Sequence, residues 1–184
     1  MADLACDLVD IGSSATKCME NFSGVGSYLL VAFPEDLTAE PEYDNTKAEY
    51  TESSFTFKAG KGFTKIKIKK QSGQVTSTLN GPGKGYSNVI TAVVDQDMES
   101  MSHNLRVMAN RDIIAMAADG KGKHYVAYDP IFRPTLEVSS DTGTTPDSDS
   151  GHTVTITCNP SVYPLVKWAG TPTLASEASA GGAG

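Results

Sequence analysis

Three cysteines and three histidines are the residues of this 184-residue chain that are best suited to nucleophilic or metal chemistry. They are Cys6, Cys18, Cys158, His103, His124 and His152. A hydrolase holds its nucleophile beside a base, often on a sharp turn between a strand and a helix, and no cysteine here has that sequence context. An odd number of cysteines without CxxC spacing favours neither a disulfide framework nor a zinc site. The sequence therefore predicts buried free thiols, no catalytic or metal-binding residue, no cofactor, and a protein that is not an enzyme.

Two short segments match known ligand-binding loops only in part. Residues 81–85 read Gly-Pro-Gly-Lys-Gly but lack the GxxxxGK[ST] spacing of a phosphate loop, and no strand and helix directly flank them. Residues 147–151 read Asp-Ser-Asp-Ser-Gly but lack the further ligands and the closing glutamate of a calcium loop. We expect the first to belong to a flexible arm and the second to a turn.

A row of lysines is the most regular charged feature of the chain. The row consists of Lys65, Lys67, Lys69 and Lys70. Ile66 and Ile68 alternate with it, so an extended chain places the isoleucines on one face and the ammonium groups on the other. Such a face is either simply solvated or meets an acidic partner. The two acidic partners considered are nucleic acid and the anionic segment 35–49 of a neighbouring copy.

Composition and net charge exclude several classes of protein. The chain is 39% hydrophobic and 20% charged, which is typical of a globular domain with a buried core. Its net charge of -7 argues against a protein that grips nucleic acid, because neutralising phosphates requires a surplus of lysine and arginine. A surface past which DNA moves without adhering remains compatible. Neither a membrane span nor a secretion signal is recognisable, so we expect cytoplasmic synthesis.

Apolar residues that recur with period two predict a mainly β fold. Residues 27–33 form an apolar run that ends at Pro34, as expected for a buried central strand. Residues 54–58 and 63–70 flank a glycine-containing turn and predict a hairpin. Further strands are expected at residues 88–94, 113–118, 124–128, 136–138 and 153–158, with a second hairpin turn at 119–123.

One helix interrupts this pattern after residue 95. Its apolar stripe consists of Met98, Met101, Leu105 and Met108, at helical spacing. Asp97 is the expected N-cap, and Asn110 can end the helix because asparagine tolerates the left-handed conformation. The stripe is expected to cover the open side of a sheet.

Three segments lack the composition of stable elements. Residues 34–51 are acidic and residues 71–86 are rich in glycine, so both are expected to be long arms. Beyond Trp168 the chain consists mostly of small residues, which predicts a flexible tail over residues 171–184. Residues 1–170 are then expected to form a single β domain.

The order of these features carries a resemblance to a known family. Asn21-Phe22-Ser23-Gly24 leads into the first strand, and a mid-chain strand precedes the short helix. Residues 136–143 then lead through a polar loop into the late strand at 151–158. This order, which spans most of the chain, resembles that of the tail tube proteins, or major tail proteins, of tailed bacteriophages. No single diagnostic motif is involved.

The resemblance implies an antiparallel β-sandwich or barrel flanked by one helix, in a structural protein of the virion tail. It implies hexameric rings whose inner strands join into a continuous barrel, and stacking of these rings into a tube. The implied partners are further copies, other tail proteins, and DNA that passes an acidic lumen without sequence-specific contact. The arms at 34–51 and 71–86 would then bind neighbouring rings.

Two other functions remain open from the sequence. One is a phage head decoration or head-tail connector protein, which shares the viral setting. The other is a carbohydrate-binding β-sandwich, which would need exposed aromatic rings around a shallow site. The candidate rings, Tyr43, Tyr50, Tyr86 and Trp168, are scattered along the chain.

Overall fold

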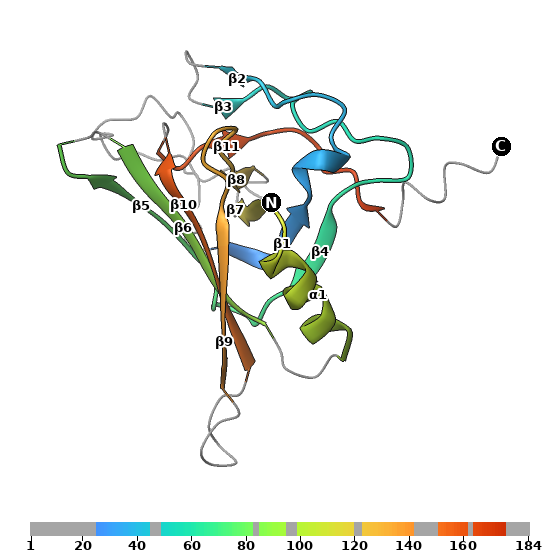
Figure 1. Ribbon diagram of the computed structural model, residues 1–184, viewed down its shortest axis with the longest axis vertical. Helices are drawn as coiled ribbons and strands as arrows, with labels where there is room; N and C mark the ends of the chain where they lie inside the picture. The colour runs from blue at the N-terminus through green and yellow to red at the C-terminus, as the bar shows by residue number, and fades with distance from the viewer. Residues whose placement is uncertain are drawn as a thin grey trace, which may run out of the picture.

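The computed structural model describes residues 25–44, 49–82, 85–94, 99–119, 123–141, 151–161 and 164–175. This part forms two β-sheets and one α-helix, α1 (Glu99–Ala109) (Figure 1). The larger sheet contains, in spatial order, β2 (Tyr43–Asp44), β3 (Glu49–Tyr50), β11 (Lys167–Trp168), β8 (His124–Ala127), β7 (Ile114–Asp119), β1 (Val25–Ala32) and β4 (Thr64–Lys67). The smaller sheet contains β5 (Gln74–Asn80), β6 (Gly85–Val94), β10 (Gly151–Ser161) and β9 (Thr135–Asp141).

The two sheets form a sandwich with one flanking helix. Paired strands run antiparallel except β3 and β11, which are parallel. The predicted fold class, a mainly β antiparallel sandwich with one helix, is therefore confirmed, although the sheets do not close into a barrel. No helix among the described residues is long and apolar enough to cross a membrane.

The central strands of the larger sheet are buried on both faces. In β1, Leu29 contributes to the core on one face of the sheet and Leu30 to the core on the other. Their partners in β7 follow the same division, since Ala117 lies opposite Leu29 and Met116 opposite Leu30. Burial on both faces explains why this part of the sequence is a continuous apolar run without alternation.

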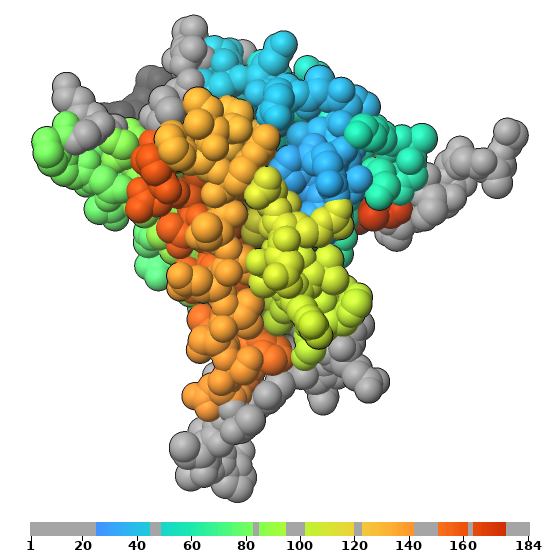
Figure 2. All heavy atoms as spheres, viewed as in Figure 1, coloured from blue at the N-terminus to red at the C-terminus, as the bar shows by residue number. Residues whose placement is uncertain are grey.

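The first core lies between the two sheets. Val94 of β6 and Ile156 of β10 point into it, and α1 adds Leu105 and Met108 from the side. Figure 2 shows α1 and β9 side by side on one face of the molecule, in agreement with their contact. The predicted helix is confirmed, and two residues of its predicted stripe, Leu105 and Met108, cover the side of the sandwich, while Met98 and the Met101 side chain lie outside the described part.

The described part of the chain includes the residues that directly follow α1 but not those that directly precede it. Asp97 and Met98, which were expected to begin the helix, lie outside the described residues. At the other end, the side-chain amide of Asn110 donates a hydrogen bond to the Arg106 carbonyl at 2.7 Å. Asn110 is not among the described residues with positive φ, so it caps the helix by this bond and not by a left-handed backbone.

The second core lies on the outer face of the larger sheet, under residues 34–44, 49–63 and 164–175. Phe55 packs edge-on against Trp168 and Tyr50, with ring centroids 5.2 Å apart in both pairs. The Trp168 indole N–H donates to the Thr51 carbonyl at 3.1 Å. The acidic segment expected to be an exposed arm therefore runs over the sheet and carries the short strands β2 and β3.

Two predicted secondary structures are wrong. Residues 54–58 form no strand, and Phe57 makes only an isolated bridge with Leu37. Their alternating aromatic side chains reflect burial in the second core and not sheet pairing. Residues 71–86, expected to be an arm, contain β5 and the beginning of β6, which pair from Gln74 with Thr91 to Asn80 with Gly85.

The end of the described chain also differs from the expected flexible tail. The backbone N–H of Phe63 donates to the Thr173 carbonyl at 2.8 Å, and that of Ala175 donates to the Phe63 carbonyl at 3.0 Å. Leu174 packs against the second core. Residues 171–175 thus lie against the sandwich, and residues 176–184 lie outside the described part.

Candidate assembly surface

The cysteine in the described residues is not set up as a nucleophile. Cys158 on β10 is completely buried. Burial raises the pKa of its thiol to about 12, the nearby Asp129 carboxylate adds to this, and a hydrogen bond with Ser161 opposes it. Such a thiol stays protonated at neutral pH, whereas reactivity requires the thiolate. Cys6 and Cys18 lie outside the described residues.

The three histidines lie in three different settings. His103 is exposed on α1. His124 on β8 is buried beside Trp168, with neither ring nitrogen hydrogen-bonded. His152 on β10 is buried, and its Nδ1 lies 2.7 Å from the Ser140 hydroxyl. Within the described ranges, no three His, Cys, Asp or Glu side chains are grouped so that they could hold a metal ion.

A hollow of about 520 Å³ lies beside the end of α1 and is lined by charged residues. Arg111 forms an ion pair with Glu35 and lies over the Phe33 ring, 4.1 Å from its centroid. Across the hollow, Arg133 pairs with Glu40 at 3.2 Å. Because each guanidinium already has a carboxylate, the hollow offers no free cation to an anionic ligand. These pairs instead fasten the 34–42 segment to the sandwich.

Tyr128 takes part in the same network. Its hydroxyl donates to Glu40 and accepts from Arg133. Burial and the Glu40 carboxylate raise the pKa of this phenol to about 12, while Arg133 opposes the rise. The hydroxyl therefore remains a donor over the whole neutral range, which suits a structural hydrogen bond.

The structure also places part of the glycine-rich segment, two of the candidate aromatic rings and part of the lysine row. Gly81 belongs to the turn between β5 and β6, while residues 83–84 and 147–150 lie outside the described part. Tyr50 and Trp168 are buried in the second core, so they are not exposed rings for a sugar. Ile66 and Ile68 are buried, and Lys65 and Lys67 are exposed, as the alternation of the lysine row predicted.

The outward face of the smaller sheet is a regular polar surface that the strand register defines. Its side chains alternate with those that point into the first core. They are Gln74, Thr76, Thr78, Ser87, Val89, Thr91, Val93, Thr135, Glu137, Ser139, Asp141, Thr153, Thr155 and Thr157. Neither apolar core includes any of them. The face therefore presents mainly hydroxyl groups, with two carboxylates on β9 and no cation among the outward residues of these strands.

Both edges of this sheet are bare in the described part of the chain. β5 pairs with β6 alone and β9 pairs with β10 alone. Each edge strand also exposes an apolar side chain, since Leu79 of β5 is 55% exposed and Val138 of β9 is 37% exposed. Unpaired strand edges of this kind pair readily with other chains. Sequence reasoning missed the β5 edge, although Val75, Ser77 and Leu79 alternate with Thr76 and Thr78 as a strand would.

Comparison of the chain with family models, with curated proteins and with solved structures finds no match in any of the three.

Proposed function

We propose that this protein is a structural subunit of the tail tube of a tailed bacteriophage, which assembles as stacked hexameric rings around a lumen that DNA traverses. One observation carries the proposal. Within the described residues, a four-stranded sheet with two unpaired edges and a hydroxyl face that belongs to neither core accompanies a second sheet that is buried on both faces. The smaller sheet is therefore the one suited to joining neighbouring copies into a continuous wall.

The strand directions of the smaller sheet favour head-to-tail closure. Because all three pairings from β5 to β9 are antiparallel, β5 and β9 run in opposite directions. Rotation about a ring axis brings β9 of one copy beside β5 of the next, and this new pair is again antiparallel. A heterologous contact of this kind forms a ring where the rotation between copies closes, and an open filament where it does not. Pairing would also bury Leu79 and Val138, and a fully buried side chain of this type contributes about 1.5–3 kcal/mol.

The outward face is compatible with a lumen through which DNA slides. Stable contact with DNA requires lysine or arginine at the phosphates. The outward residues of β5, β6, β9 and β10 include neither, although the Lys69 side chain reaches the face beside Gly151, and the Glu137 carboxylate would repel a phosphate backbone over short distances. Among the described outward residues, the expected acidic lumen is thus reduced to Glu137 and Asp141 on a hydroxyl background, and Asp141 already has an interaction partner. Further copies, other tail proteins and passing DNA are the proposed partners, and the virion tail is the proposed location.

Electron microscopy of the purified full-length chain, imaged over a range of concentrations, tests the proposal. We expect hollow rings that stack into tubes of constant diameter. Leu79→Lys and Val138→Lys should abolish rings while preserving the circular dichroism spectrum, because each places a charge at a sheet edge. Ser102→Lys, on the exposed side of α1, is the matched control and should assemble normally. Monomers at high concentration, or tubes that tolerate both edge variants, would overturn the proposal.

A further inference from the structure

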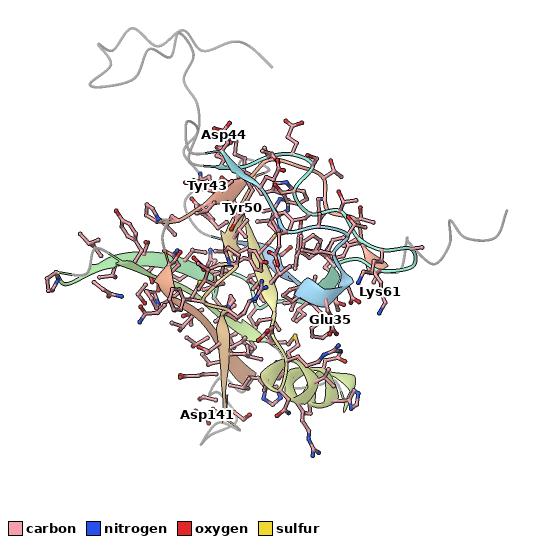
Figure 3. The ribbon with its side chains drawn as sticks, turned by 45° about the horizontal axis from the view of Figure 1, so that its top comes forward. Glu35, Tyr43, Asp44, Tyr50, Lys61 and Asp141 are labelled. Atoms are coloured by element: carbon pink, nitrogen blue, oxygen red, sulfur yellow. The ribbon has the colours of Figure 1, made fainter. Side chains whose placement is uncertain are left out.

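The two edges of the larger sheet carry opposite charges. At the β4 edge, Lys65 and Lys67 are exposed, and Lys70 follows a short distance along the chain. The opposite edge is formed by β2, which Tyr43 and Asp44 mark in Figure 3. There Glu42 immediately precedes β2 and Glu52 follows β3, and both side chains are exposed. We call Lys65, Lys67 and Lys70 the lysine edge, and Glu42 and Glu52 the acidic edge.

The lysine edge has no counter-charge from the described part of its own chain. Among the described residues, no carboxylate lies within ion-pair distance of Lys65, Lys67 or Lys70. Lys65 instead lies over the Tyr28 ring, 4.1 Å from its centroid. This contact holds its ammonium group near the surface of the strand and leaves its charge uncompensated.

Most carboxylates of the 35–49 segment, in contrast, are already used within the chain. The ion pairs are Glu35 with Arg111, Asp36 with Lys61, Glu40 with Arg133, and Glu49 with Lys123. Asp44 also has an interaction partner. Glu42 and Glu52 have no cation within ion-pair distance among the described residues. Within the segment 35–49 this leaves Glu42, and Glu52, three residues beyond the segment, is a second exposed carboxylate without such an ion pair.

Backbone hydrogen bonds hold the two glutamates in one region. The Thr51 N–H donates to the Glu42 carbonyl at 3.0 Å, and the Ser54 hydroxyl donates to the same carbonyl at 2.8 Å. Glu52 lies between these two donors in the chain. The acidic edge is therefore a defined patch on a folded segment.

A single copy cannot join its own two edges. Five strands separate β2 from β4 in the sheet order. With about 4.8 Å between neighbouring strands, the two edges are roughly 29 Å apart. An attraction between them can act only between different molecules, and it then runs head to tail from one copy to the next.

We propose that the lysine edge of one copy binds the acidic edge of a second copy. The contact rests on the proposed function and extends it. It adds an electrostatic joint, a contact between the larger sheets of neighbouring copies, to the pairing of their smaller sheets. Exposed ion pairs are individually weak and are screened by salt, so the joint depends on its repetition in every contact of the assembly.

A charge-swap experiment on the full-length chain tests this joint. One variant carries Lys65→Glu and Lys67→Glu, and the other carries Glu42→Lys and Glu52→Lys. Each alone should raise the concentration needed for assembly by about tenfold at low salt, because like charges then face each other. An equimolar mixture of the two variants should restore assembly, as should a chain with all four changes, because opposite charges again meet. Light scattering measures the threshold, and microscopy identifies the particles.

Matched controls separate this joint from a general effect of charge. Lys67→Glu and Arg106→Glu change the net charge equally, but Arg106 lies on α1, so only the first should weaken assembly. If the wild type assembles and both double variants assemble equally well, the charged joint is wrong while the proposed function stands. If the variants weaken assembly but their mixture does not restore it, the pairing between these edges is also overturned. A wild type that never assembles overturns both proposals.

Discussion

His124 is the residue whose environment most directly links stability to pH. Burial lowers the pKa of its imidazole from the ordinary value of 6.5, and the nearby Asp119 carboxylate opposes the shift. The unfolded chain therefore binds a proton at a higher pH than the folded chain does. The contribution of His124 to stability is complete above the unfolded value and is lost as the pH falls toward the lowered folded value.

We accordingly expect the free energy of unfolding to decrease as the pH falls from about 7.5 to about 5.5. His124→Gln should flatten this decrease, even if it lowers stability at every pH, and His103→Gln on the exposed side of α1 should leave the slope unchanged. Urea denaturation at a series of pH values measures both slopes. An equally steep profile in His124→Gln would show that another group is responsible.

Gly62 is the position where a single methyl group should disturb the end of the described chain. A Cβ atom there would lie 2.6 Å from the Thr173 carbonyl oxygen and 2.8 Å from the Ala175 nitrogen. Gly62→Ala should therefore push residues 173–175 away from Phe63 and cost about 1–3 kcal/mol in the free energy of unfolding. Gly60→Asn is the control, because the space around Gly60 is open and asparagine tolerates its positive φ. Urea denaturation of the two variants should show a clear loss only for Gly62→Ala.

At the scale of elements, the sequence predicts secondary structure best where an element buries a single face, because that burial sets the pattern of apolar residues. Thr153 to Cys158 alternate strictly because β10 has a core on one side and hydroxyl groups outward. The strand β1 was also recognisable, because its apolar run ends at a proline. The helix was found because Leu105 and Met108 follow the 3.6-residue period that burial of one face requires.

The two wrong secondary-structure predictions are also explained by how the segments are buried and paired. The 54–58 segment alternates because Phe55 is buried in the second core, and a covering segment can do this without pairing to a strand. The glycines of the segment 71–86 favour an arm, yet Gly73 lies outside β5 and Gly81 lies in the turn. Edge pairing with β6 then overrides the weak strand propensity of the residues between them. The bare edges could not be predicted, since they depend on which strands become neighbours.

The strand β5 gives a test that separates a sheet edge from a loose arm. Val75 packs against the first core, while Thr76 points outward and is exposed. Val75→Ala should lower the free energy of unfolding by about 1–2 kcal/mol, as expected for removing partly buried methyl groups. Thr76→Ala, its neighbour, should change it by less than about 0.5 kcal/mol. Thermal unfolding followed by circular dichroism measures both, and equal, negligible effects would mean that β5 is detached in solution.

At the scale of the whole molecule, the two sheets are covered differently, and this difference would set the direction of the proposed assembly. The larger sheet has a core on each face, so only its edges remain available for other molecules. In the described part of the chain, the smaller sheet has one face outside both cores and two unpaired edges. Copies joined through these edges form a wall with hydroxyl groups on one surface and the larger sheets on the other.

Cysteine cross-linking across the proposed seam tests this wall directly. A cysteine at Thr76 on β5 is combined in turn with one at Thr135, Glu137 or Ser139 on β9, in a chain with Cys6 and Cys18 replaced by serine. All four positions point outward. Disulfides form only between Cα atoms about 4.4–6.8 Å apart, so the partner directly opposite Thr76 should react best. We expect a covalent ladder that ends at the hexamer on a non-reducing gel.

The alternation of β9 supplies the control. Val138 points to the inner face, so Thr76→Cys combined with Val138→Cys places the two thiols on opposite sides of the sheet. This pair should not cross-link, because a strand presents neighbouring side chains to opposite faces. A ladder that appears equally for inner and outer positions would indicate random collision. No ladder at any outward position, in a sample that microscopy shows to be assembled, would mean that the smaller sheets do not meet at these edges.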